Sequence, residues 1–270
     1  CSEKLALALG TKGLINIQYL IYEGELYVIE VNPRASRTVP FVSKSIGVPL
    51  AKLAAKVMSG CKLKDLGFTK EVVPPYYTVK EAVFPWNRFP GIDVVLGPEM
   101  HSTGEVMGID TDPDVAYLKS QISAFNALPK EGLVFISVSD RDKSIVTEIA
   151  RTIAKAGFDI CATKGTMIHL LQNGIECERA YKVHERRRPD IVDRIKNGDI
   201  VFVINTPGSH DAREDEVAIR AAAVSSNISY TTDLSSARAC AAAMLHAKNK
   251  ETNVRTLQEY HAEAVAEYQN

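Results

Sequence analysis

The feature that most constrains the fold is an alternation of apolar strands and amphipathic helices over residues 132–248. The runs that read as buried strands are GLVFISV (132–138), FDICAT (158–163), DIVFVINT (199–206) and ISYTT (228–232). Helical patterns occupy residues 142–157, 189–198, 215–227 and 233–248. Strands that are apolar on both faces and alternate with helices are typical of a parallel sheet covered on both sides. The second half of the chain is therefore predicted to be an α/β domain.

The first half is predicted to open with a helix at 2–9 and then an antiparallel hairpin. LINIQYLIY and ELYVIEV are strand-like runs that meet at Glu23-Gly24, a strong hairpin turn signal. A helix at 49–60 follows. Residues 61–128 are rich in Pro and Gly and are expected to wrap over a core, apart from a helix near 112–126.

A short linker is predicted to separate two domains. The sequence Pro-Lys-Glu-Gly at 129–132 is typical of an exposed connection. It divides the chain into predicted domains of residues 1–128 and 129–270. The first residue is Cys1 and an amphipathic run is already under way at Ser2, so we expect the chain to be a fragment of a larger fold.

Composition removes several classes of protein. The formal net charge is −1 at pH 7, which disfavours a nucleic-acid binder. The five cysteines are odd in number and form no C-x-x-C pair, which argues against a disulfide framework or a zinc site and fits a reducing cytoplasm. No uncharged apolar run approaches the length of a transmembrane helix, so no membrane partner is expected.

A polar stripe lies on the predicted hairpin. Pairing the strands about the Glu23-Gly24 turn brings Gln18 opposite Glu30, and Asn32 shares the face of Glu30 because alternate strand residues point the same way. Carboxylate and amide oxygens suit Mg²⁺, and Arg34 just beyond them suits a phosphate. A polar pair satisfied at a strand end is the alternative, and spacing alone does not separate the two.

A second polar set follows the strands of the α/β domain. In an open parallel sheet, ligands collect beyond the carboxyl ends of the strands. Hydroxyls, an amide and ammonium groups there suit a phosphate monoester, although each threonine alone also fits a helix cap. The side chains concerned are those of Thr163, Thr166, Lys182, Asn205 and Thr206.

Longer motifs resemble one family. The run IEVNPRASRTVPFVSKSIGVPLAKLAAKVMSG (29–60) resembles the end of an ATP-grasp domain in the large subunit of carbamoyl phosphate synthetase. FTKEVVPPYYTVKE (68–81) and GPEMHSTGEVMGID (97–110) resemble the same subunit. The resemblance covers nearly the whole chain. It implies the tail of the second, carbamate-phosphorylating ATP-grasp domain, followed by a Rossmann-like regulatory domain of methylglyoxal-synthase-like fold.

The resemblance also implies roles for single residues. Gln18, Glu30 and Asn32 would be ligands of Mg²⁺ (or Mn²⁺) on the phosphates of ATP, and Arg34 would be catalytic, neutralising charge on the transferred phosphoryl group. Glu81, Tyr230 and Thr232 match positions that line an ornithine site. Pro207 departs from some relatives, where a further Thr stands. A regulatory nucleotide such as UMP or IMP would be held by Ser137, Lys143, Thr163, Gly165, Thr166, Lys182, Asn205 and Thr206.

The implied activity is ATP-dependent phosphorylation of carbamate to carbamoyl phosphate, for pyrimidine and arginine biosynthesis in the cytoplasm. A small glutaminase subunit would deliver ammonia, the remainder of the large subunit would complete the active site, and the full enzyme would oligomerise. The fragment alone is expected to be inactive, because nothing in it resembles the glycine-rich phosphate loop or the carbamate site. One alternative is a stand-alone nucleotide-sensing module. A lyase resembling methylglyoxal synthase is disfavoured, because its catalytic aspartates have no clear counterpart.

Overall fold

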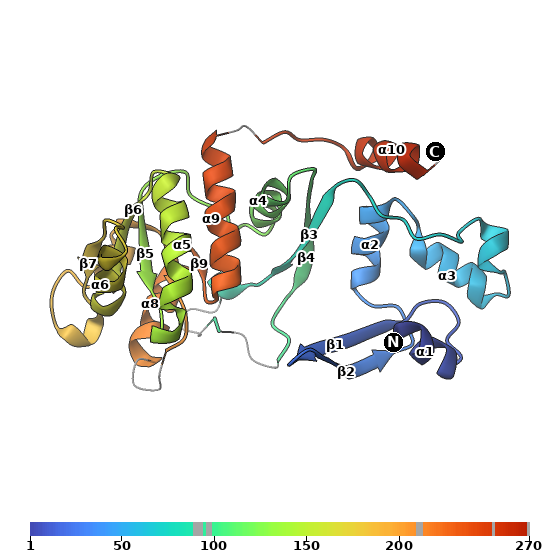
Figure 1. The fold of residues 1–270 in the computed structure, drawn as a ribbon, viewed down its shortest axis with the longest axis horizontal. Coiled ribbons are helices and arrows are strands. Elements are labelled where there is room, and N and C mark those ends of the chain that lie inside the picture. Colours follow the sequence, from blue (N-terminus) through green and yellow to red (C-terminus); the bar gives the residue numbers. More distant parts are fainter. Residues whose placement is uncertain (89–93, 96–98, 209–212, 250–251, 269–270) are drawn as a thin grey trace. The chain divides into compact units, whose positions relative to one another are not determined.

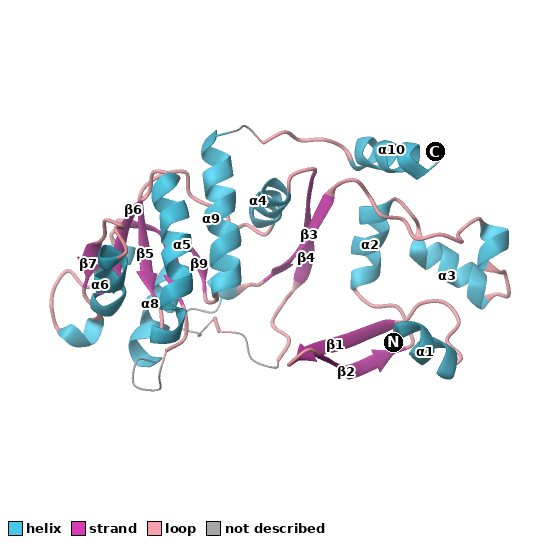
Figure 2. Cartoon of the chain, viewed as in Figure 1, coloured by secondary structure: helices cyan, strands magenta, loops and turns pink. Residues whose placement is uncertain are grey.

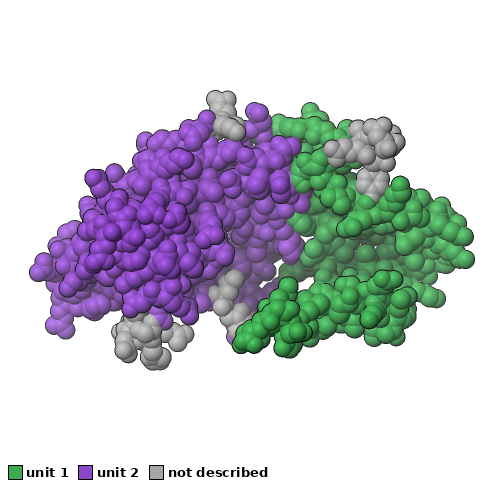
Figure 3. All heavy atoms as spheres, viewed as in Figure 1, with its two compact units in different colours: residues 1–76, 254–270 green, residues 77–253 purple. Residues whose placement is uncertain are grey.

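The computed structural model describes residues 1–88, 94–95, 99–208, 213–249 and 252–268. The chain forms two compact units, one of residues 1–76 with 254–270 and one of residues 77–253 (Figure 3). The predicted boundary between residues 128 and 129 lies inside the second unit and stays a prediction. Among the described residues, no helix is both long and apolar enough to cross a membrane.

The first unit contains the predicted hairpin, which is confirmed (Figure 1). Its strands pair antiparallel and place Gln18 opposite Glu30, with a bulge after Gln18. Glu23 and Gly24 have φ values of 49° and 82°, as expected where two central turn residues must both be left-handed. The elements are α1 (Ser2–Ala8), β1 (Asn16–Tyr22) and β2 (Glu25–Asn32).

A helix from the far end of the chain completes the first unit. The ring of Tyr260 meets the ring of Tyr76 edge-on at a centroid distance of 5.2 Å. The Tyr76 hydroxyl donates to the Ser45 carbonyl at 2.8 Å, which joins these aromatic residues to the second helix of the unit. The helices are α2 (Thr38–Ile46), α3 (Leu50–Met58), the 3₁₀ turn η1 (Leu63–Leu66) and α10 (Leu257–Tyr268).

The second unit begins with two strands that the sequence analysis did not predict. β3 and β4 pair antiparallel, and α4 packs against both. Their residues are mostly half-buried rather than alternately buried and exposed, so the period-two signal is weak. The predicted helix near 112–126 is confirmed. The elements are β3 (Tyr77–Val83), the 3₁₀ turn η2 (Trp86–Arg88), β4 (Gly104–Asp110) and α4 (Pro113–Ser123).

The predicted parallel sheet is confirmed, with five strands in the order β7-β6-β5-β8-β9. Side chains of β5 alternate between its two faces. Val134 and Ile136 join one buried cluster with residues of α5 and α9, while Phe135 joins another with residues of α7 and α8. β7 is only three residues long and has no apolar run, which is why it was missed. The strands are β5 (Leu133–Ser137), β6 (Asp159–Thr163), β7 (Glu178–Ala180), β8 (Ile200–Asn205) and β9 (Ser229–Thr231).

Helices cover both faces of this sheet (Figure 2). Several begin immediately after a strand, so their first turns lie beside the carboxyl edge of the sheet. The helices and 3₁₀ turns are η3 (Asp140–Asp142), α5 (Lys143–Lys155), α6 (Lys164–Gln172), η4 (Val183–Glu185), α7 (Ile191–Lys196), α8 (Arg213–Ser225) and α9 (Leu234–Asn249).

Candidate functional site

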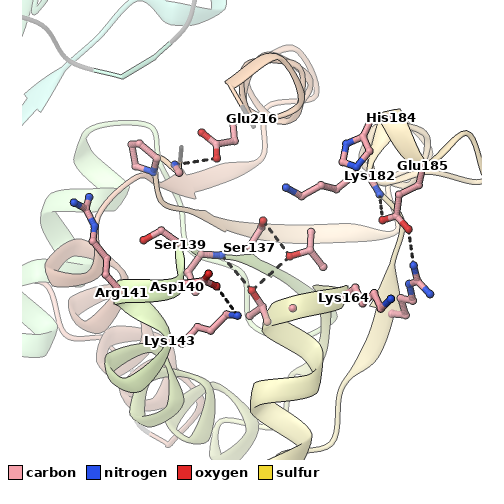
Figure 4. Close-up of a pocket in the computed structure, with 17 residues that line it drawn as sticks. Ser137, Ser139, Asp140, Arg141, Lys143, Lys164, Lys182, His184, Glu185 and Glu216 are labelled. Atoms are coloured by element: carbon pink, nitrogen blue, oxygen red, sulfur yellow. Dashed lines mark hydrogen bonds and ion pairs between the residues drawn. The ribbon is translucent and has the colours of Figure 1, made fainter. Parts of the chain in front are cut away.

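A cavity of about 790 Å³ lies at the carboxyl ends of β5 and β6 (Figure 4). Because β5 lies between β6 and β8 in the sheet, the loops that follow these strands meet at one edge. The structure thereby brings together most of the residues proposed for nucleotide binding. Those that line the cavity are Ser137, Lys143, Thr163, Gly165, Thr166 and Lys182.

Buried hydroxyl groups form one wall of this cavity. The Thr163 hydroxyl donates to the Ser137 hydroxyl at 3.2 Å and lies 3.5 Å from the Thr166 hydroxyl. The Thr166 hydroxyl accepts the backbone N–H of Val138 at 3.4 Å. A Cβ on Gly165 would lie 3.3 Å from the Lys143 amine, so that amine lies close to the backbone where α6 begins. Hydroxyls, a helix start and an ammonium group together favour an anion.

The charges around the cavity favour the same chemistry. Its described lining includes five Lys or Arg side chains and three carboxylates. Asp140 accepts a bond from Lys143 at 2.7 Å, which lowers the pKa of Asp140. The Lys182 amine points toward the middle of the cavity (Figure 4), and it makes no ion pair with any carboxylate in the described parts of the chain. The cavity therefore has cationic groups to spare for a phosphate.

Asn205 and Thr206 lie behind the cavity lining rather than in it. Asn205 donates to the Ser137 carbonyl at 3.3 Å and accepts from Arg220 at 3.0 Å, so both ends of its amide are engaged. The Thr206 hydroxyl donates to Asp142 at 2.7 Å. These bonds hold the loops after β5 and β8 in place. Direct contact of the two side chains with a nucleotide stays a prediction, whereas Pro207 does line the cavity.

Several lining residues were not singled out from the sequence. Lys164 had a visible signal, because it stands between Thr163 and Gly165 in ATKGT. Arg179 lies on β7, a strand too short to predict. Glu216 lies on α8 and accepts the Gly208 N–H at 2.9 Å, a contact that no local sequence pattern predicts.

The hairpin register brings the side chains of the predicted polar stripe together. Glu30 Oε1 accepts amide N–H bonds from Gln18 and from Asn32, both at 2.8 Å. Arg34 donates to the Asn32 side-chain carbonyl at 3.3 Å and to the Ala35 carbonyl at 3.0 Å. All four side chains therefore share one face. These oxygens are the hard donors that Mg²⁺ prefers.

A metal ion on this stripe would need further oxygens. Within the described residues, no group of three or more His, Cys, Asp and Glu side chains is arranged for metal binding. Mg²⁺ commonly takes one or two carboxylates and completes its shell with water and substrate phosphates. One carboxylate with two amides therefore fits an ion that arrives with ATP, and the metal role of Gln18, Glu30 and Asn32 stays a prediction.

The residues proposed for ornithine lie together in a smaller cavity of about 200 Å³. Glu81, Tyr230 and Thr232 all line it. Burial raises the pKa of Glu81, and the bond it accepts from Gln121 at 2.9 Å lowers that pKa in part. Asp233 lines the same cavity, and none of its described lining residues is Lys, Arg or His. This arrangement suits a cationic ligand, and ornithine stays a prediction.

Comparison with known proteins agrees with both halves of the fold. Residues 1–66 match the family described as carbamoyl-phosphate synthase L chain, ATP binding domain, and residues 146–232 match the MGS-like domain. The chain thus joins part of an ATP-binding domain to an MGS-like domain. More particularly, it belongs to the carbamoyl phosphate synthase large-chain family over the segment that it spans.

The relatives come from distant organisms. The chain is 51% identical to the carbamoyl phosphate synthase large chain of Gemmatimonas aurantiaca over 95% of its own length. It is 47% identical to that of Vibrio vulnificus over 98%, and 49% identical to that of Archaeoglobus fulgidus over 97%. It spans 23–24% of the length of these relatives.

Proposed function

We propose that this chain works within a carbamoyl phosphate synthase large chain, where ATP phosphorylates carbamate and a nucleotide bound in the MGS-like domain regulates that step. The observation that carries the proposal is the stripe of Gln18, Glu30 and Asn32, which lies within a match to an ATP-binding domain. The proposal includes a glutaminase small subunit as ammonia donor, Mg²⁺ or Mn²⁺ as cofactor, oligomerisation of the full enzyme, and a cytoplasmic role in pyrimidine and arginine biosynthesis.

The stripe is suited to hold a metal–phosphate group in a defined orientation. Glu30 accepts bonds from the amide nitrogens of Gln18 and Asn32, so the three oxygen-bearing side chains are held together on one face before a cation arrives. Mg²⁺ bound there would neutralise charge on the phosphates of ATP. Arg34 is held by Asn32 and by the Ala35 carbonyl, so its guanidinium is ordered before a phosphoryl group arrives. Phosphoryl transfer depends mostly on such positioning and on charge stabilisation.

The metal assignment is tested by Glu30→Gln in a complete large chain assembled with its small subunit. We expect carbamoyl phosphate synthesis, and ATP formation from carbamoyl phosphate and ADP, to fall at least about 100-fold, because a preorganised charge is lost from the site. Glu25→Gln is the matched control, since Glu25 is an exposed carboxylate on the same strand. Synthesis at the wild-type rate in Glu30→Gln would show that the stripe is structural.

The regulatory assignment is tested by calorimetric titration of the chain with UMP, IMP and inorganic phosphate. Lys182→Ala is expected to weaken binding about 10–100-fold, because a charge-assisted contact to phosphate is worth roughly 1.5–3 kcal/mol. Lys155→Ala, on α5 and outside the cavity lining, should bind as the wild type does. Absence of binding at millimolar concentration contradicts the assignment.

The cavity also favours a second candidate, a stand-alone nucleotide-sensing module. In that case the nucleotide would bind as described, while Glu30→Gln would leave every measured activity unchanged. The two candidates therefore differ in the outcome of the hairpin variant and agree in the outcome of the titration.

A further inference from the structure

A carboxylate on α8 contacts the turn that follows Lys182. Asp215 is only 8% exposed. Its Oδ1 accepts the backbone N–H of His184 at 3.3 Å, and its Oδ2 pairs with the Nδ1 of the His184 ring. Asp215 is not among the residues that line the anion cavity, whereas His184 and Lys182 both are. Any effect of Asp215 on the cavity would therefore be transmitted through the turn that it holds.

The same turn is held independently on the side of β7. Glu185 accepts the backbone N–H of Lys182 at 3.1 Å and pairs with Arg179. Partial burial by itself would raise the pKa of Glu185, but these bonds lower it below its usual value. The η4 turn is thus bonded at both ends, by Glu185 to the β7 side and by Asp215 to α8 (Figure 4 shows the β7 side).

Fixing this turn matters because of the kind of side chain it carries. Lysine has a flexible four-carbon stem, and much of its contact energy with an anion is lost as rotamer entropy if its backbone also moves. In metal sites, removing a contact that orients a ligating residue commonly lowers affinity about 10–100-fold, and a lysine directed at a phosphate depends on positioning in the same way. A nearly buried carboxylate that accepts two bonds from one residue is well placed for that role.

We propose that Asp215 is a positioning residue for the anion cavity: it holds His184 and thereby keeps the Lys182 amine directed at the phosphate group of the bound ligand. This inference rests on the proposed function, since it requires that the cavity bind a phosphate ester. It adds Asp215 of α8, which lies 31 positions after His184 in the chain, to the residues that serve nucleotide recognition.

The test is a titration of the whole chain with inorganic phosphate and with UMP. Asp215→Asn is expected to weaken both affinities about tenfold. His184→Ala removes the ring contact with Asp215 but keeps the backbone bond, and the His184 side chain is 65% exposed, so this variant should fold even if Asp215→Asn does not. It is expected to weaken both affinities by a smaller factor than Asp215→Asn does. Asp199→Asn is the matched control, because Asp199 contacts only the Arg194 side chain among the ion pairs of the described residues and lies outside the cavity lining.

A double-variant cycle separates positioning from general structure. In a Lys182→Ala background, Asp215→Asn should weaken phosphate binding no further, because Asp215 acts through Lys182. Equal losses in both backgrounds, or no loss in the wild-type background, overturn the positioning role. A wild-type chain that binds neither phosphate nor UMP overturns this inference together with the nucleotide part of the proposed function, whereas wild-type binding with an unaltered Asp215→Asn affinity overturns this inference alone.

Discussion

At the scale of single residues, the small cavity that Glu81 lines also contains a thiol and a phenol that burial keeps neutral. Burial raises the pKa of Cys240 to about 12 and raises that of Tyr117 well above its ordinary value. The Tyr117 hydroxyl and the Cys240 thiol lie 3.5 Å apart. Both therefore stay protonated at neutral pH, and the charge next to them comes from carboxylates. A cationic ligand would compensate that charge.

Glu81→Gln is expected to change how stability depends on pH. Burial raises the folded-state pKa of Glu81, so the folded chain binds this proton more tightly than the unfolded chain does. That stabilisation is complete below the unfolded-state pKa and is lost as pH rises through the folded-state pKa. The variant, which has no such loss, should gain stability relative to wild type as pH rises above the unfolded-state pKa of a glutamate, about 4.3.

The measurement is urea unfolding followed by the fluorescence of Trp86, the single tryptophan of the chain. Glu131→Gln, at an exposed position, should show a constant difference from wild type across the same range. A constant difference for Glu81→Gln as well would show that burial of this carboxylate has no energetic consequence.

At the scale of elements, β4 and α4 pack with their backbones almost in contact. A Cβ on Gly108 would lie 1.9 Å from the Ala116 carbonyl oxygen and 2.5 Å from the Ser120 nitrogen. Both atoms belong to the helix backbone, so no side-chain rotation relieves the clash. Glycine at this strand position is therefore required by the helix above it.

Gly108→Ala is expected to destabilise the second unit by about 3 kcal/mol or more, because α4 must move away from the strand. Gly104→Ala is a close control, since Gly104 lies on the same strand and a Cβ there meets nothing within 4 Å. Equilibrium unfolding in urea compares the two variants. If they prove equally stable, the close approach of β4 and α4 is wrong.

At the scale of the whole molecule, the two units differ in how completely they bury their strands. Val134 and Ile136 of the parallel sheet are fully buried, whereas Ile21 and Ile29 of the hairpin are 73% and 62% exposed. An isolated two-stranded hairpin is marginal in water, while a parallel sheet covered on both faces is a stable core. Stability is therefore expected to be uneven along the chain.

Hydrogen exchange measures this directly. Amides of β5 and β8 should exchange only through global unfolding of their unit, while those of β1 and β2 should exchange orders of magnitude faster. Tyr260→Ala should accelerate exchange in α2 and leave β5 unchanged, because Tyr260 is buried within the first unit. Loss of a buried aromatic typically costs about 3–5 kcal/mol. Faster exchange in β5 as well would contradict this division into units.

The predictable part of this protein rests on short-range patterns. The apolar strands between residues 132 and 232 indicated a parallel sheet, because only burial on both faces tolerates such runs. The Glu23-Gly24 turn set the register of the hairpin, and a two-residue period then placed Glu30 and Asn32 on the face of Gln18. The family motifs around Asn32 and Arg34 added the chemistry that spacing alone left open.

Contacts between distant segments were decided only by the tertiary structure. The return of Tyr260 to Tyr76, the close approach of α4 to Gly108, and the bond from Asp215 to His184 each join residues without a shared local pattern. A sequence determines locally which face of a strand or helix is apolar, because that depends on a period of a few residues. Which faces meet, and which polar groups then lie close enough to bond, depends on the packing of whole elements and so follows from the folded chain alone.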